Sequence, residues 1–368
     1  MEGRILVLNT GSTSTKIGLF DAGKLLFEQN ISHPNSELQK YESVMDQDQM
    51  RLEAITGFLS SKEVALESID LVMSRGGMIT PIEPGVYLVT EEMKAALREG
   101  KSGVHASNVC AIVADKLKDM VNAKRGELGL PEVKAYIADA PFSDEMIDEA
   151  RVGGHPLFPR KPIFHALNSR AVTRFYAREK GLDYSDVTVI VAHMGGGTSV
   201  SLHHKGRIVD TNNALGGDGP VSPDRTGTVY GSDLVEVCYS GQYTKDEVKK
   251  MLVGKGGVVA HFGTNNFKDV TDRAEAGDSE CELFVTAFAL QVAKYIAALS
   301  ADVCGKVDAI ILTGGIAYNA PLMKRIEDRV SFIAPVVKVP GESELESLAE
   351  NGYGVLAGTF PVKLYSAK

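Results

Sequence analysis

One stretch constrains the fold of this chain more than any other: residues 187–209, VTVIVAHMGGGTSVSLHHKGRIV. Val187 to Val191 are apolar and mostly β-branched, which predicts a buried strand. The chain then turns through Gly195-Gly196-Gly197 and returns as a strand at Val200-Ser201-Leu202. A tight turn rarely needs three glycines, whereas a tip without Cβ atoms lets a bulky anion approach backbone N–H groups. A flexible hairpin tip is the alternative for this stretch taken alone.

A second copy of the same pattern lies at the amino terminus. Residues 5–26, ILVLNTGSTSTKIGLFDAGKLL, can be laid over residues 188–209 without a gap. Residues 69–78, IDLVMSRGGM, match residues 307–316, VDAIILTGGI, in the same way. Two matched pairs in the same order indicate two homologous halves. Two phosphate-type hairpins facing each other would form a cleft for a nucleotide.

Composition excludes several classes of function. The 368 residues carry a formal net charge of −9, which argues against a general nucleic-acid or anionic-membrane binder. The amino terminus has no signal-peptide core, and no run approaches the roughly 18 apolar residues of a membrane span. The four cysteines are scattered without a CxxC pair, so neither a zinc site nor a disulfide frame is expected. A cytoplasmic protein without nucleic-acid or membrane partners is predicted.

Helical spacing predicts several helices around these strands. Residues 47–60 and 167–180 have amphipathic patterns. Ser279-Glu280-Cys281-Glu282 resembles a capping box at the start of a long apolar core helix that ends near Val303. A final helix is expected at 348–358.

Polar residues follow the predicted strands of the first half. Ser12 and Lys16 lie at the first tip, where hydroxyls and a lysine can contact phosphate, and the Asn9 amide could hold the water shell of a metal. Arg75 follows a buried strand and precedes two glycines, a position where α/β folds bind ligands. The alternative for the first tip is a polar β-turn, and the alternative for Arg75 is a surface arginine in a salt bridge.

For several further candidate site residues, the sequence leaves both a functional and a structural role open. Asp139 follows the strand 133–138, which suits a metal-binding or catalytic carboxylate and equally an Asx-turn. His165 precedes a helix, where a histidine is more often structural. His105 is either an edge of the substrate site or a helix cap. Arg225 lies in a loop rich in Gly, Asp and Pro and supplies a second arginine. The sequence has no Walker A motif and no dinucleotide-binding fingerprint.

Several motifs together resemble the acetate and butyrate kinase family of the actin, hexokinase and Hsp70-like superfamily, and the butyrate kinase branch most of all. The resemblance covers essentially the whole chain, in order, through these segments: LNTGSTSTKIGLF (8–20), SRGGMI (74–79), ADAPFSD (138–144), FHALNSRA (164–171), AHMGGGTS (192–199), SPDRTG (222–227), LTGGIAYN (312–319) and GESELESLAENG (341–352).

The resemblance implies a fold and a reaction. The expected fold is α/β, with two duplicated ribonuclease H-like (actin-like ATPase) domains whose mixed sheets are flanked by helices. The domains would comprise residues 1–140 with 349–368, and residues 141–348, with the active site in the cleft between them. The expected reaction is Mg²⁺-dependent, reversible phosphoryl transfer between ATP and butanoate, giving butanoyl phosphate and ADP. Family membership also implies a homo-oligomer, at least a dimer.

The resemblance also assigns roles to residues. Four would act in catalysis: Arg75, Asp139, His165 and Arg225. Asn9 and Glu344 would lie on the metal side, with Glu342 and Glu346 as rivals of Glu344. Nucleotide contacts would come from Asn9, Ser12, Lys16, His193, Gly195, Gly196, Gly197, Asn266, Phe267, Lys268, Gly315, Ile316 and Asn319. His193 would contact the γ-phosphate.

Two departures from the acetate kinase pattern leave the acid undetermined. The tip reads HMGGG where acetate kinases typically have HLGNG, and Gly315-Ile316-Ala317-Tyr318-Asn319 replaces a GIGEN run. A branched-chain (2-methylpropanoate) kinase and an acetate or propionate kinase are the near alternatives. A sugar-type kinase would need Asp139 as a true base, which the paired arginines disfavour. An actin- or Hsp70-like binding module would need a further domain or a filament-type tail.

Overall fold

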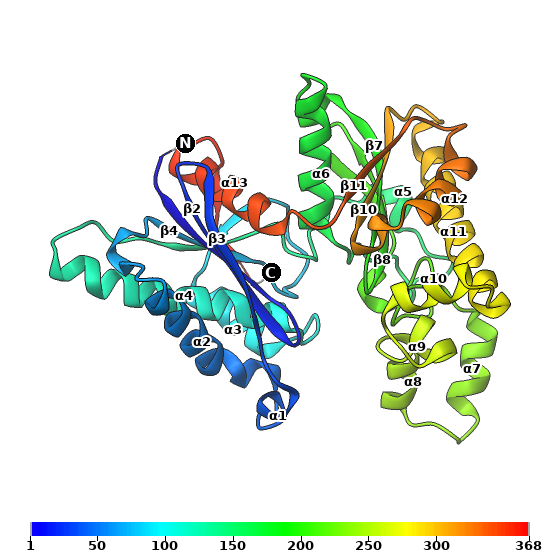
Figure 1. Cartoon of the computed structure of the whole chain (residues 1–368), viewed down its shortest axis with the longest axis horizontal. Helices are drawn as coiled ribbons and strands as arrows, with labels where there is room; N and C mark the ends of the chain where they lie inside the picture. The colour runs from blue at the N-terminus through cyan, green and yellow to red at the C-terminus, as the bar shows by residue number, and fades with distance from the viewer. Residues whose placement is uncertain (1, 367–368) are drawn as a thin grey trace. The chain divides into compact units, whose positions relative to one another are not determined.

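The computed structural model describes residues 2–366 and divides the chain into two compact units. Unit 1 comprises Met1–Asp144 and Ser343–Lys368, and unit 2 comprises Glu145–Glu342 (Figure 1). The chain therefore passes from unit 1 to unit 2 after Asp144 and returns after Glu342. By this division Glu344, at the return, belongs to unit 1.

Unit 1 is built on a seven-stranded mixed sheet with the order β12-β5-β6-β4-β1-β2-β3. Strands β1, β4 and β6 are parallel, while β1, β2 and β3 form an antiparallel meander. The strands are β1 (Arg4–Thr10), β2 (Ser14–Asp21), β3 (Lys24–Ser32), β4 (Leu71–Arg75), β5 (Val86–Leu88), β6 (Ala135–Ala138) and β12 (Val362–Lys363). The α-helices are α1 (Asn35–Leu38), α2 (Asp48–Ser61), α3 (Glu91–Glu99), α4 (Ala106–Glu127) and α13 (Glu344–Leu356).

Unit 2 has a five-stranded mixed sheet with the order β11-β10-β7-β8-β9. Its strands are β7 (Thr188–Met194), β8 (Thr198–His204), β9 (Arg207–Thr211), β10 (Ala309–Gly314) and β11 (Val336–Pro340). Its α-helices are α5 (Asp148–Arg151), α6 (Ala166–Glu179), α7 (Gly231–Tyr239), α8 (Lys245–Leu252), α9 (Gly257–Phe262), α10 (Phe267–Glu275), α11 (Ser279–Ser300) and α12 (Ala320–Val330). Six short 3-10 helices complete the described chain: Val44–Gln47, Leu66–Ser68, Tyr184–Asp186, Ala214–Gly216, Ala301–Val303 and Gly315–Tyr318. The predicted fold class, two α/β units with mixed sheets flanked by helices, is confirmed.

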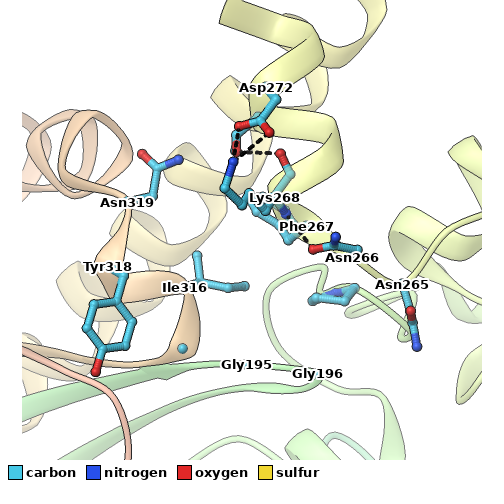
Figure 2. A pocket seen from close by; sticks show the side chains of 13 residues that line it. Gly195, Gly196, Asn265, Asn266, Phe267, Lys268, Asp272, Ile316, Tyr318 and Asn319 are labelled. Carbon is cyan, nitrogen blue, oxygen red and sulfur yellow. Dashed lines mark hydrogen bonds and ion pairs between the residues drawn. The ribbon is translucent and has the colours of Figure 1, made fainter.

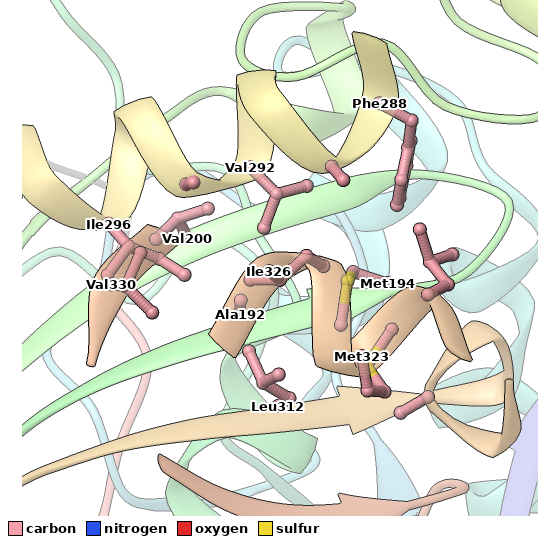
Figure 3. Close-up of a cluster of buried hydrophobic side chains, with 14 of the residues drawn as sticks. Ala192, Met194, Val200, Phe288, Val292, Ile296, Leu312, Met323, Ile326 and Val330 are labelled. Carbon is pink, nitrogen blue, oxygen red and sulfur yellow. The ribbon is translucent and has the colours of Figure 1, made fainter. Parts of the chain in front are cut away.

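Each sheet is packed against its own helices. In unit 2, residues of α11 and α12 such as Phe288, Val292 and Ile326 pack on Val200 and Leu312 of the sheet (Figure 3). In unit 1 the apolar faces of α2 and α4 cover the sheet in the same manner. These two cores hold the strand ends that carry the candidate site.

One expectation is that no stretch approaches the length of a membrane span. The helix over Ser279–Val303 corrects it, because this helix is long and apolar enough to cross a membrane by length and composition. Its stripe of buried residues, from Cys281 to Leu299, belongs to the core of unit 2. This is the burial pattern of the core helix that the sequence predicts.

One predicted helix cap and one predicted helix start are wrong. The cap of α11 is Asp278, whose Oδ1 accepts hydrogen bonds from the backbone N–H groups of Glu280 and Cys281, so the expected capping box at Ser279 is not formed. Helix α13 begins at Glu344 and not at Leu348. The earlier start places the Glu344 carboxylate at a helix N-terminus, where the helix dipole stabilises negative charge.

The two hairpins differ by one residue, which the gapless overlay misses. Asn9 lies opposite Lys16 in the first hairpin, and His193 lies opposite Ser199 in the second. The turn from His193 is thus one residue shorter than the turn from Asn9. Each is the penultimate residue of its strand, β1 or β7. The structural counterpart of Asn9 is therefore His193, whereas the overlay pairs Asn9 with Ala192.

Candidate active site

The tip of the second hairpin is shaped by an arginine that lies directly on it. A Cβ added to Gly197 would come within 1.3 Å of the Nη1 atom of Arg225. The turn is closed by a hydrogen bond of 3.0 Å from the Gly195 N–H to the Gly197 carbonyl. Glycine at position 197 is thus required for the guanidinium to pack against the tip, a reason more specific than the flexibility suggested by the sequence.

Arg225 is a buried cation with unused hydrogen-bonding capacity. Its side chain is 15% exposed, and its Nε and Nη1 atoms are buried without a hydrogen-bond acceptor among the described residues. Asp224 Oδ1 lies 3.7 Å from Nε, and burial lowers the pKa of the Arg225 guanidinium against the opposing effect of Asp224. Buried donors without partners are costly, so the geometry suits an incoming anion.

Two histidines stack beside this tip. The rings of His165 and His193 lie 3.9 Å apart with an interplanar angle of 13°. His165 Nδ1 lies 3.0 Å from the Ser199 hydroxyl, and His193 Nδ1 lies 2.9 Å from the Asn168 amide nitrogen. An amide nitrogen can only donate, so His193 Nδ1 accepts and its Nε2 carries the hydrogen. The structure thus brings the two predicted histidines together.

A pocket of about 380 Å³ lies next to the glycine tip in unit 2 (Figure 2). This volume is within the range of small-molecule sites, roughly 300–1,000 Å³. Its walls come from the tip, from α10 and from the 3-10 turn after β10. The residues lining it are Gly195, Gly196, Pro223, Asn265, Asn266, Phe267, Lys268, Thr271, Asp272, Gly315, Ile316, Tyr318 and Asn319. Eight of the predicted nucleotide contacts therefore line one pocket: Gly195, Gly196, Asn266, Phe267, Lys268, Gly315, Ile316 and Asn319.

The pocket combines apolar surface with a few placed polar groups. Phe267 and Ile316 provide apolar surface. Lys268 Nζ donates to both oxygens of Asp272, at 2.8 and 2.6 Å. Asp272 is a lining residue that was not predicted, although its four-residue spacing from Lys268 is the spacing of a helical ion pair and would reveal it. Tyr318, with 72% of its surface exposed, is a further lining residue available for stacking on a base.

In unit 1, three polar side chains converge at the ends of β1, β4 and the start of α13. Asn9 Nδ2 donates to Glu344 Oε2. Arg75 Nη1 lies 3.5 Å from Asn9 Oδ1 and 3.4 Å from Glu344 Oε2. Both charged side chains are largely buried, at 17% exposed for Arg75 and 7% for Glu344. Asn9, Arg75 and Glu344 are called the strand-end cluster below.

Asp139 lies at the neighbouring strand end of unit 1. Arg75 is paired with Ala138, the residue before Asp139, and a Cβ on Gly76 would come within 2.6 Å of the Ala140 side chain. Asp139 is buried and has a positive φ of 42°, a left-handed conformation that Asp tolerates better than most residues. Its carboxylate is thus placed at the same sheet edge as the strand-end cluster.

The donor set of unit 1 fits a magnesium ion that is held mainly by water and phosphate. Asn9 and Glu344 offer an amide and a carboxylate oxygen, the hard ligands that Mg²⁺ prefers. Within residues 2–366 no group of three or more His, Cys, Asp or Glu side chains could hold a metal by itself. Mg²⁺ commonly uses one or two protein ligands with substrate phosphates, so two oxygen donors suffice. Of the three rival glutamates, Glu344 is the one in the cluster, while Glu346 is exposed.

The first hairpin tip rests on an arginine that was not predicted from the sequence. Ser12 is exposed, and Lys16 lies 3.7 Å from Glu28 at the strand edge. Arg51 of α2 is fully buried beneath the tip and donates to the carbonyls of Ser12 and Ser14, at 3.2 and 2.9 Å. The available signal was an arginine on the apolar stripe of residues 47–60.

His105 caps a helix in this structure. Its Nδ1 accepts a hydrogen bond of 3.2 Å from the backbone N–H of Ser107, in the first turn of α4. Of the two readings left open by the sequence, the structure shows the helix cap.

Comparison with known proteins identifies relatives over the full chain. A sequence model described as the Acetokinase family matches residues 157–333. "Butyrate kinase 1" of Clostridium acetobutylicum is 47% identical over 98% of this chain and 99% of its own length. "Probable butyrate kinase" of Clostridium botulinum is 45% identical over 99% of this chain and its whole length. Among solved structures, an acetate kinase of Porphyromonas gingivalis has a TM-score of 0.78 at 18% identity, covering 96% of this chain and 100% of that protein. The structural likeness extends to the fold.

Proposed function

The chain belongs to the acetokinase family, and we propose on this premise that it is a butyrate kinase. It would transfer the terminal phosphoryl group of ATP reversibly to butanoate, giving butanoyl phosphate and ADP. Full-length relatives that are 45–47% identical carry that name. The nucleotide would occupy the pocket of unit 2, with its phosphates toward Gly195 and Gly196.

One observation carries this proposal: the buried guanidinium of Arg225 presents Nε and Nη1 without acceptors beside a glycine tip. An acyl kinase must bring a carboxylate anion against a polyphosphate, so its main task is charge neutralisation and positioning. Fixed donors that need no reorganisation stabilise charge that develops during transfer. Arg225 supplies such donors, and Arg75 would supply a second cation from the strand-end cluster.

The remaining side chains would position the phosphates and the acceptor. His165 would donate to the transferring phosphoryl group, and His193 would contact the terminal phosphate through Nε2–H. Asn9 and Glu344 would hold Mg²⁺, which neutralises phosphate charge when bound. Ser12 and Lys16 would contact phosphate from the first tip. A carboxylate acceptor is already ionised at pH 7, so Asp139 would orient the water around the ion and not act as a base.

A hydroxylamine trap for acyl phosphate tests the proposed reaction. The assay would use ATP, Mg²⁺ and five acids: acetate, propionate, butyrate, 2-methylpropanoate and valerate. Butyrate is expected to give the highest kcat/KM, because full-length relatives that are 45–47% identical carry the butyrate kinase name. A maximum at 2-methylpropanoate, acetate or propionate would reassign the acid within the family. No hydroxamate with any acid, together with phosphorylation of sugars, would overturn the proposal.

Two accompanying features are proposed with the reaction: a cytoplasmic location and a homo-oligomer, at least a dimer. Helix α7 supports the second, because none of its nine residues is buried. Tyr239 and Val235 on this helix are 87% and 53% exposed, and Tyr230 before it is 80% exposed. A helix of this length gains little stability without packing, which favours a covering partner copy. Light scattering on the purified protein would measure the oligomeric state.

A further inference from the structure

Glu342 places a carboxylate at the tip of the second hairpin. Its Oε1 atom lies 3.4 Å from Nε2 of His193. A Cβ added to Gly195 would lie 3.4 Å from that Nε2 and 3.8 Å from the Glu342 oxygen. Gly195 also lines the pocket of unit 2. The carboxylate thus stands beside the imidazole, at the end of the pocket where the nucleotide phosphates would lie.

His193 has one hydrogen to offer an anion. Its Nδ1 atom is engaged by the Asn168 amide nitrogen at 2.9 Å, and the ring is 1% exposed. Nε2–H, which faces the Glu342 carboxylate, is therefore the hydrogen left for an anion. A carboxylate and a phosphate oxygen cannot both occupy the position in front of it, because like charges a few ångströms apart repel strongly near a protein surface.

The Glu342 side chain can leave this position while its backbone stays in place. The preceding residue, Gly341, exchanges two backbone hydrogen bonds with Gly314, of 3.0 and 3.1 Å. Its carbonyl also accepts from the Thr313 hydroxyl at 3.2 Å. The Glu342 side chain is 46% exposed, and its 3.4 Å contact is longer than a normal N–H···O bond. A rotamer change into solvent would therefore free Nε2–H.

We propose that Glu342 competes with the terminal phosphate of the nucleotide for His193, and so weakens the binding of ATP relative to ADP. The γ-phosphate must displace the carboxylate, whereas ADP has no phosphate at that position. In the direction of ATP synthesis the same competition promotes release of ATP. The assignment of the γ-phosphate to His193 rests on the proposed function.

The test compares Glu342→Gln with Glu346→Gln. Glutamine keeps the shape of the side chain but removes its charge, and Glu346 is an exposed glutamate in the first turn of α13. Isothermal titration calorimetry would measure Kd for Mg-ADP and for the Mg²⁺ complex of a non-hydrolysable ATP analogue, without carboxylate. In Glu342→Gln the analogue should bind about fivefold more tightly or better, while ADP changes by less than about twofold. Glu346→Gln should bind both ligands like the unmodified protein.

Three results would overturn the inference: equal changes for both nucleotides, no change, or weaker binding of the analogue. The third would mean that Glu342 supports His193 instead of competing for it. The hydroxylamine trap on the same preparations separates this inference from the proposed function. If butyrate yields hydroxamate and the nucleotide difference is absent, the inference alone fails. If no acid yields hydroxamate and the nucleotide difference is present, the proposed reaction fails and the competition stands.

Discussion

The two hairpins share a skeleton but support their tips with arginines from unrelated places. In unit 1, Arg51 rises from α2 and lies beneath the tip, fully buried. In unit 2, Arg225 comes from a loop that follows the hairpin and lies on Gly197. Each guanidinium faces the turn that would approach phosphate. The duplicated strands are thus conserved between the halves, while each tip has its own source of positive charge.

The hydrogen bonds show that these two arginines have different tasks. Arg51 donates to two tip carbonyls, to the Thr15 hydroxyl and to the Gln47 amide oxygen, and no carboxylate contacts it within residues 2–366. Arg225 has two nitrogen atoms without acceptors among those same residues. A fully hydrogen-bonded arginine stabilises the fold, whereas unused buried donors indicate a ligand. The comparison separates an arginine that builds a tip from one whose buried donors are left for a ligand.

The largest effect is expected from Arg225→Ala. Loss of these donors should lower kcat by on the order of 10²–10³-fold or more, the effect of removing one fixed donor to transition-state charge. ATP affinity should change little, because Arg225 does not line the pocket of unit 2. Stability without ligand should stay the same or rise, since a buried cation with unmet donors is removed. Hydroxamate kinetics, ATP titration and urea unfolding measure the three quantities.

Arg207→Ala is the control, because this arginine is exposed on β9 of the same unit. It should leave kcat within about twofold. A normal kcat in Arg225→Ala, accompanied by loss of ATP affinity, would contradict the role assigned to Arg225.

The next largest effect is expected when a methyl group is added to a hairpin tip. Adding one to each tip in turn tests how closely each tip is packed. Gly197→Ala would place a Cβ 1.3 Å from the present Nη1 position of Arg225, so the guanidinium must move. A displacement of about 1 Å can cost 10²-fold in rate, and we expect a loss of that order. Gly11→Ala in the first tip would meet Ser14 Oγ at 3.6 Å, an ordinary contact, and should cost only a few-fold. Equal losses from the two substitutions would show that the tips do not differ in this way.

The sequence predicts the skeleton well because local patterns encode it. The apolar runs of β1, β2, β7 and β10 and the amphipathic stripe of α6 are read directly from residue periodicity. Eight of the predicted nucleotide contacts cluster in the pocket of unit 2 because the resemblance transfers whole motifs at once. These parts of the molecule depend on short-range order in the chain.

Contacts made at long range could not be predicted in the same way. The missing residue in the second turn is visible only from the pairing of His193 with Ser199, since a gapless overlay gives a plausible alignment. Arg51 lies 39 positions from Ser12, and nothing local in either segment reports their contact. The bond from Asn168 to His193 spans 25 positions. Side-chain partners across elements depend on tertiary packing, which a periodicity does not contain.

A third prediction measures the structural task of Arg51. Arg51→Met would leave the Ser12 and Ser14 carbonyls and the Thr15 hydroxyl without this donor. Each buried group left unsatisfied costs about 1–3 kcal/mol, so the free energy of unfolding should fall by about 3 kcal/mol. Urea unfolding with a fixed m value would measure the loss.

Arg98→Met is the matched control, since this side chain is 50% exposed and lies 3.8 Å from Asp48. Surface pairs of this kind contribute little, so a change below about 0.5 kcal/mol is expected. Arg51→Lys keeps the charge but reaches fewer acceptors. Its loss of unfolding free energy should lie between those of Arg51→Met and Arg98→Met. A stability loss in Arg225→Ala equal to that in Arg51→Met would remove the distinction between the two arginines.

The smallest expected effect is on the pH dependence of the unfolding free energy. It comes from two buried histidines, one near each hairpin. His33 lies 2.9 Å from the Thr15 hydroxyl in the first, and burial followed by the charge of Arg51 lowers its pKa. His203 on β8 is fully buried, and burial lowers its pKa well below 6.5, with Arg170 and Arg174 adding to the effect.

Because their pKa values are lowered in the folded protein, both histidines bind protons less readily there than in the unfolded chain, where they bind protons below about pH 6.5. Acidification through that pH therefore favours unfolding, by up to about 1.4 kcal/mol per pH unit for each histidine. His203→Asn should flatten the dependence of the unfolding free energy on pH between about pH 6.5 and 5 by up to that amount. His33→Asn should flatten it by less, because the pKa of His203 is lowered further. His155→Asn, at an exposed histidine, should leave the slope as it is. Urea unfolding at four pH values would compare the slopes, and a larger change in His33→Asn than in His203→Asn would reverse the ranking of the two hairpins.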